Sequence, residues 1–218
     1  MNPLVEQFGV QFMPGCLVKP TEDFAPDLIT ATPTKEAAAL SYILEGMLQM
    51  ENLLSMPGCT GLTYSPDKGY QVTPLFTSDP TGSWNELETT NFVEDTARLN
   101  LQAGEVERSH VTSVALSRNI GDKEQRIIII GDADCLSNAE IEMWRKGINA
   151  RNYSFVRGAF SWLSYEEAPI DVRRLIPPDN KIYIGKGGMK ITKHAMVEGL
   201  PGLLLVIALL IWLRRRGR

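Results

Sequence analysis

Short apolar stretches, separated by turns that contain glycine or proline, follow one another through the first 165 residues. The stretches at 27–33, 70–76 and 111–117 predict β-strands, the second with an edge or an end at Pro74. The continuous run Ile127–Ile130 predicts a strand that is covered on both faces, as in the middle of a parallel sheet.

Apolar residues with helical spacing lie between these strands. They predict helices at three places, namely 35–50 after an N-cap at Thr34, from Ser137 or Asn138 to Arg145, and 149–163. A short helix is also expected to begin at Asn85. Strands that alternate with helices predict an α/β domain, a layered sheet with flanking helices, over residues 1–168. Residues 169–194 are rich in proline and glycine and predict an extended segment.

The last part of the chain has a different pattern. Residues 195–213 are apolar apart from Glu198, and as a helix they are about 28 Å long, close to the hydrocarbon thickness of a bilayer. A buried core helix is the alternative. The run lacks a polar face, however, and it ends in Trp212 and an arginine cluster, which are typical anchors of a spanning helix. We therefore expect a transmembrane helix over 195–213.

The distribution of charge bears on the partners of the protein and on its orientation in the membrane. The net charge is −4 and the pI about 5.3, which excludes a general nucleic-acid binder. Residues 1–213 carry 18 Lys and Arg against 26 Asp and Glu, and four arginines lie within 214–218. The positive-inside rule then predicts a cytoplasmic tail at 214–218 and a body in the periplasm, held at the inner membrane. No export signal is visible at the N-terminus, which leaves two interpretations: a tail-anchored cytoplasmic protein that defies the charge rule, or the C-terminal portion of a longer protein. We expect the second.

The segment Ile130–Asn138 carries most of the candidate chemistry. Asp132 and Asp134 follow directly after a predicted strand, where ligands collect in open α/β sheets. Together with Ser137 and Asn138 they supply oxygen ligands of the kind that Mg²⁺ or Ca²⁺ prefers. The alternative is that Asp132 closes a tight turn and that Ser137 or Asn138 caps the next helix. Both interpretations are open at this point.

A second alternative is a hydrolase that uses Cys59, which lies in the turn-like segment Pro57–Gly61. A catalytic thiol needs a general base and an orienting group. The two histidines, His110 and His194, are isolated along the chain, so a small turn cysteine is the simpler interpretation. Gly185–Lys190 lacks the spacing of a Walker A loop, so no ATPase is predicted.

Several motifs together resemble a known family. In chain order they are Leu4–Val10, Thr73–Ser78 followed by Ser83–Glu86, Ile129–Asn138, Phe160–Leu163 before Ile170–Arg173, and the apolar span with its arginine cluster. This series resembles the GldG-like auxiliary components of ABC-2 type transporters, which are associated with gliding motility. The resemblance extends over nearly the whole chain and is most specific in Gly131–Asn138 and Thr77–Glu86. Cys135 stands where the family has an aromatic residue.

The resemblance implies a domain related to the class I glutamine amidotransferase-like fold, incomplete in this chain and without catalytic machinery. It implies a non-enzymatic accessory subunit for recognition or assembly, beside an ABC-2 permease and a separate ATPase, with no cofactor. Gly199, Gly202 and Ala208 would let the anchor pack against a permease helix. If the domain binds a ligand, the expected residues are Thr77, Ser78, Trp84, Asp132, Asp134 and Asn138.

Overall fold

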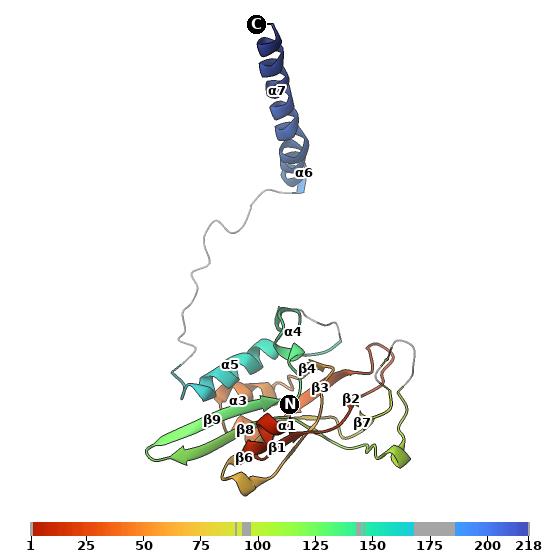
Figure 1. Cartoon of the computed structure of the whole chain (residues 1–218), viewed down its shortest axis with the longest axis vertical. Helices are drawn as coiled ribbons and strands as arrows, with labels where there is room; N and C mark the ends of the chain where they lie inside the picture. Colours follow the sequence, from red (N-terminus) through yellow and green to blue (C-terminus); the bar gives the residue numbers. More distant parts are fainter. Residues whose placement is uncertain are drawn as a thin grey trace. The chain divides into compact units, whose positions relative to one another are not determined.

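The computed structural model describes residues 2–89, 91–92, 97–142, 145, 147–167 and 186–217. The chain divides into two compact units, Met1–Asp171 and Val172–Arg218. The first unit contains a β-sheet with helices packed on it, and the second unit is helical where it is described (Figure 1). Residues 169–185 of the expected extended segment, which include the motif at 170–173, lie outside the described residues.

The first unit is built on a sheet of seven strands in which every described pairing is antiparallel. Their spatial order is β1 (Val10–Phe12), β5 (Leu62–Tyr64), β8 (Val111–Ile120), β6 (Gln71–Ser78), β3 (Leu28–Pro33) and β4 (Leu54–Pro57), with β9 (Lys123–Ile130) also paired to β8. The mixed α/β class with a layered sheet is therefore confirmed, whereas the parallel arrangement expected around the isoleucine run is wrong.

The isoleucine run shows why the strand direction was missed. β8 and β9 form a long hairpin, and the four isoleucines of β9 alternate between the two faces of the sheet. Ile128 and Ile130 pack against the core on the helical side, and Ile127 and Ile129 pack against the core on the other side. A continuous apolar run indicates that both faces of a strand are covered by other residues. In this protein an antiparallel strand is covered in this way.

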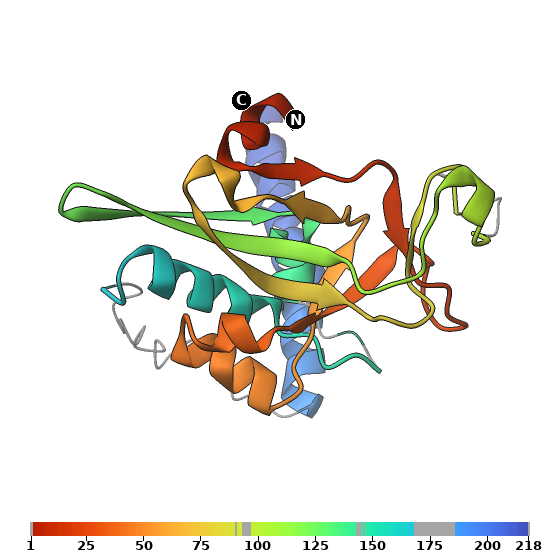
Figure 2. The same cartoon turned by 90° about the horizontal axis from the view of Figure 1, so that it is seen from below.

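Three helices cover one face of the sheet (Figure 2). They are α2 (Lys35–Ala38), α3 (Tyr42–Gln49) and α5 (Asn152–Leu163). Phe155 of α5 packs edge-on against Phe76 of β6, with 5.3 Å between the ring centroids. The predicted helix at 35–50 is divided in two, because Thr34 caps α2 and the Ser41 hydroxyl accepts a hydrogen bond from Ile43 N–H and starts α3.

The opposite face has its own cover. Helix α1 (Asn2–Val5) and the 3₁₀ turn η1 (Glu6–Phe8) contribute Val5 and Phe8 to an apolar cluster on this side, together with residues of strands β1, β5, β8 and β9. Val5, Val10, Tyr70 and Leu116 are buried in this second core. Two apolar layers therefore enclose the β8–β9 hairpin near the end of β9, where the chain leaves the sheet.

A smaller two-stranded sheet, β2 (Cys16–Val18) with β7 (Trp84–Glu86), extends to one side. The helix expected from Asn85 is wrong, since Asn85 lies in β7. Pro74 lies inside β6 at a position where this strand pairs with β8 only, so the other side of the strand is a local sheet edge, as predicted. The register shifts directly after Pro74, and the proline precedes the residues of β6 that pair with β3. Proline is tolerated at such a locally unpaired position next to a β-bulge.

In the second unit, α6 (Lys186–His194), a π-helical turn η5 (Ala195–Gly199) and α7 (Leu200–Arg216) follow without a break. Gly188–Arg216 is a 29-residue stretch long and apolar enough to cross a membrane, and none of its residues is buried inside the protein. The described part of the chain thus contains a C-terminal helix that is able to span a membrane, as predicted. Its helical structure begins earlier than expected, because 186–194 is helical and not extended.

Candidate functional site

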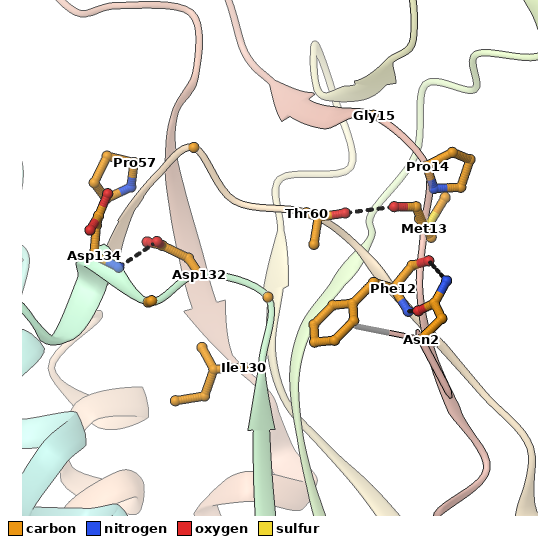
Figure 3. A pocket seen from close by; sticks show the side chains of 13 residues that line it. Asn2, Phe12, Met13, Pro14, Gly15, Pro57, Thr60, Ile130, Asp132 and Asp134 are labelled. Atoms are coloured by element: carbon orange, nitrogen blue, oxygen red, sulfur yellow. Dashed lines mark hydrogen bonds between the residues drawn. The ribbon is translucent and has the colours of Figure 1, made fainter. Parts of the chain in front are cut away.

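A cleft of about 690 Å³ opens at the end of β9 (Figure 3). Four segments that are distant in the sequence line it: Asn2 of α1, residues 12–15 from the last residue of β1 onward, residues 57–60 from the last residue of β4 onward, and residues 130–134. Hydrogen bonds tie these segments together. The Asn2 side chain bonds both backbone groups of Phe12, and the Thr60 hydroxyl donates to the Met13 carbonyl at 2.9 Å. Hydrogen bonds between distant segments therefore hold the cleft in shape.

Gly131 joins three of these segments. Its N–H donates to the carbonyl of Thr112 in β8 at 2.8 Å, and its carbonyl accepts from Thr60 N–H at 2.9 Å. A Cβ atom at this position would lie 2.0 Å from the Thr60 carbonyl oxygen. Only glycine allows the backbones to approach this closely, and this approach brings Asp132 to the floor of the cleft.

Asp132 closes the turn that follows. Its carboxylate accepts hydrogen bonds from Asp134 N–H at 2.7 Å and Cys135 N–H at 3.1 Å, and the Ser137 hydroxyl accepts from Glu140 N–H in the first turn of α4 (Asn138–Glu142). The turn-and-cap interpretation of this segment is confirmed. Asp132 is only 7% exposed, and burial is the main cause that raises its pKa to about 6, although the two N–H bonds oppose the shift.

This pKa predicts a measurable pH dependence. The folded protein holds the Asp132 proton more tightly than the unfolded chain, whose Asp has a pKa of 3.8. The stability contributed by protonated Asp132 is fully present below about pH 4 and is lost as the pH rises to about 6. In Asp132→Asn, the unfolding free energy relative to wild type should therefore increase across that window by about 3 kcal/mol at most.

Guanidinium titrations of both full-length proteins in detergent at several pH values measure this difference. Other groups titrate in the same range, but they do so in both proteins and cancel in the comparison. A difference that stays constant between pH 4 and pH 6 would show that Asp132 titrates normally.

The structure brings together only part of the expected ligand-binding set. Asp132 and Asp134 both line the cleft, whereas Asn138, an exposed residue at the start of α4, does not line it. Thr77 and Ser78 lie at the end of β6, where Ser78 bonds His110 through backbone and hydroxyl. Trp84 belongs to β7 and donates to Glu86 at 3.2 Å. These last three residues stabilise other parts of the domain.

Cys59 is completely buried, and its thiol donates to the Thr60 carbonyl. Burial raises the pKa of this thiol well above 9.0, and Asp132, Cys16 and Cys135 raise it further. Since the thiolate is the nucleophilic form, these neighbours suppress reactivity. His110 bonds the Val106 carbonyl, and burial lowers its pKa. No feature of this environment favours a Cys59 nucleophile.

The metal-dependent alternative also lacks support. Among the residues that the structure describes, no group of three or more His, Cys, Asp or Glu side chains is arranged to hold a metal ion. The Asp132 oxygens already accept backbone N–H groups, so they are poorly available as ligands. What the cleft offers is a mixed surface: apolar side chains such as Phe12 and Pro57 next to two carboxylic acids.

Sequence reasoning missed the residues that shape this cleft from elsewhere in the chain. Asn2 has no motif around it, and Thr60 stood out only as a neighbour of Cys59 in the segment Pro57–Gly61; both side chains bond backbone groups that only the fold brings near. Asn152 was also missed, although it is 2% exposed and bonds both Ser55 and the Cys135 carbonyl. A polar residue at the start of an apolar helix was the one signal that could have drawn attention to it.

Comparison with known proteins adds no relative to this description. No protein-family model, no curated protein and no solved structure matches the chain.

Proposed function

We propose that this chain is a non-enzymatic, membrane-anchored accessory subunit of an ABC-2 type transporter, with a role in gliding motility as the narrower form of the proposal. The observation that carries it is the joining of two parts in one chain. A folded domain with a cleft is followed by an apolar helix that has no buried residue and is long enough to cross a bilayer. The partners would be an ABC-2 permease and its separate ATPase.

Binding fits the domain better than catalysis. The cleft contains carboxylic acids and apolar side chains, while the Cys59 thiol is held protonated by burial. A cleft of this composition suits recognition of a polar group or a segment of a partner protein. The relation to the class I glutamine amidotransferase-like fold stays a prediction, and the proposal does not depend on it.

The helix has a face on which a partner helix could pack closely. Ala195, Gly199 and Gly202 are spaced by four and three residues, so they share one side. A Cβ atom on Gly202 would meet nothing within 4 Å, and one on Gly199 would meet only the His194 carbonyl oxygen at 3.9 Å. Ala208 is nine residues from Gly199 and lies on the opposite side of a regular helix, so it does not extend this face.

Enlarging this face should weaken assembly. We expect the Gly199→Leu, Gly202→Leu variant to lose most of its permease and ATPase in affinity purification from detergent-solubilised native membranes, because small residues allow close helix contact. The matched control is Ala208→Leu, which enlarges the opposite face and should purify with both partners. Recovery of neither transporter protein with the wild-type chain would contradict the proposal itself.

Positive charges flank the apolar helix on both sides. Four lysines lie within the 15 residues before the apolar stretch 195–213, namely Lys181, Lys186, Lys190 and Lys193, and four arginines follow it, namely Arg214, Arg215, Arg216 and Arg218. The positive-inside rule is thus balanced for these residues and does not choose an orientation. We propose a periplasmic domain on the inner membrane and a cytoplasmic 214–218 tail from the family resemblance alone.

Protease added to intact spheroplasts tests this orientation. We expect cleavage of the domain without lysis, because a periplasmic domain is accessible from outside. Cleavage that requires lysis would reverse the orientation and would leave the membrane anchor itself unaffected.

A further inference from the structure

The helix that precedes the apolar stretch carries a stripe of lysines. Lys186, Lys190 and Lys193 are spaced by four and three residues in α6, so their positions fall on one face of the helix. The side chains of Lys190 and Lys193 are both exposed. Positions three apart on a helix place their Cβ atoms about 5–6 Å from each other, so two ammonium groups share a small area.

These two lysines have no acidic partner among the described residues. The ion pair within the described part of this unit joins His194 to Glu198 at 3.0 Å. Two like charges at this spacing repel each other, and a shared anion would relieve the repulsion. The opposite end of the helix is arranged differently. Arg214, Arg215 and Arg216 are consecutive and therefore spread around the helix, and Arg216 stacks on Trp212.

The length of the helix places the lysine pair at a definite depth. From Lys193 to Arg214 the helix rises about 31 Å, which matches the hydrocarbon thickness of about 30 Å. With the arginines at one boundary, Lys193 lies at the other, and Lys190 lies about 4.5 Å farther out. The headgroup layer on each side is about 5–8 Å deep. Both ammonium groups therefore reach the level of the lipid phosphates.

We propose that Lys190 and Lys193 form a binding site for the phosphate of an anionic phospholipid, in the leaflet that surrounds α6. The proposal rests on the membrane anchoring proposed above. Paired, exposed and uncompensated ammonium groups on one side of the helix select an anionic headgroup over a zwitterionic one. The site would fix the rotation of the helix about its axis, and thereby the direction in which the Gly199–Gly202 face points.

The test uses the full-length chain reconstituted in phosphatidylcholine bilayers with spin-labelled lipids. Electron paramagnetic resonance gives the association of phosphatidylglycerol relative to phosphatidylcholine at the protein surface. We expect the wild type to prefer phosphatidylglycerol, and the Lys190→Gln, Lys193→Gln variant to lose this preference severalfold, up to about fivefold for each lysine.

The matched control is Lys68→Gln, Lys123→Gln, which removes two exposed lysines from the first unit. It should keep the wild-type preference. An unchanged preference in the α6 variant, or an equal loss in both variants, overturns the lipid site. Extraction of the wild-type chain from the bilayer by alkaline wash overturns the membrane anchor instead, so the two failures are distinguishable.

Discussion

Replacing Gly131 with alanine is expected to destabilise the domain by about 3–5 kcal/mol, because the new methyl group would overlap the backbone. Its Cβ would lie 2.0 Å from the Thr60 carbonyl oxygen and 3.2 Å from the Thr112 carbonyl oxygen. These atoms belong to backbone segments that Gly131 itself bonds, so they move only if those hydrogen bonds are broken. Guanidinium unfolding of the full-length chain in detergent, followed by the fluorescence of the buried Trp84 and Trp162, measures the loss.

The control for this substitution is Gly121→Ala, in the turn between β8 and β9. Gly121 has a φ of +60° and nothing within 4 Å of an added Cβ, so alanine there meets backbone strain without a clash. A cost of about 1–2 kcal/mol is expected. Equal costs at both positions would show that the strand contact at Gly131 relaxes easily, and that Asp132 is positioned by other means.

Replacing Asn152 with leucine should cost a comparable 3–5 kcal/mol, since each buried partner left unsatisfied costs about 1–3 kcal/mol. The side-chain oxygen of Asn152 accepts a hydrogen bond from the Ser55 N–H at 3.0 Å. Its side-chain NH₂ group donates to the backbone carbonyls of Ser55 at 2.7 Å and Cys135 at 2.9 Å. These bonds join the start of α5 to β4 and to the 3₁₀ turn η4 (Asp134–Leu136). The same unfolding titration measures the effect.

Tyr153→Ala is the matched control, on the next residue of the same helix. Tyr153 is 58% exposed, and a surface substitution of this kind is expected to change the unfolding free energy by about 0.5 kcal/mol or less. If Asn152→Leu unfolds like this control, water or a rearranged backbone satisfies Ser55 and Cys135, and the side chain is not the bridge that the structure indicates.

The strands show how much of the fold the local hydrophobic pattern predicts. Alternation and continuous apolar runs predicted β3, β6, β8 and β9 at nearly their observed positions, because side-chain period is a local property. The pattern did not contain strand direction, so β9 was assigned to a parallel sheet. It also missed that Ser41 competes with the continuing helix, which divides 35–50 in two.

The candidate site, too, was predicted only in part from the sequence. Asp132 and Asp134 stood out because they follow a strand, and both line the cleft. Thr77, Ser78 and Trp84 were equally prominent in the sequence, yet their partners lie elsewhere in the domain. Spacing along the chain does not report which polar side chains find backbone partners within the fold, and such partners decide whether a residue is structural or open to a ligand.

The sequence by itself determined the apolar C-terminal helix and the positions of four strands, β3, β6, β8 and β9, since each follows from the composition or period of one continuous segment. Only the tertiary structure decided the antiparallel pairing, the cleft and the raised pKa of Asp132. Each of these depends on segments such as α1, the 57–60 turn and the end of β9, which approach one another through long-range packing. That approach depends in turn on a glycine that allows backbone contact and on hydrogen bonds between distant residues, neither of which has a local signature.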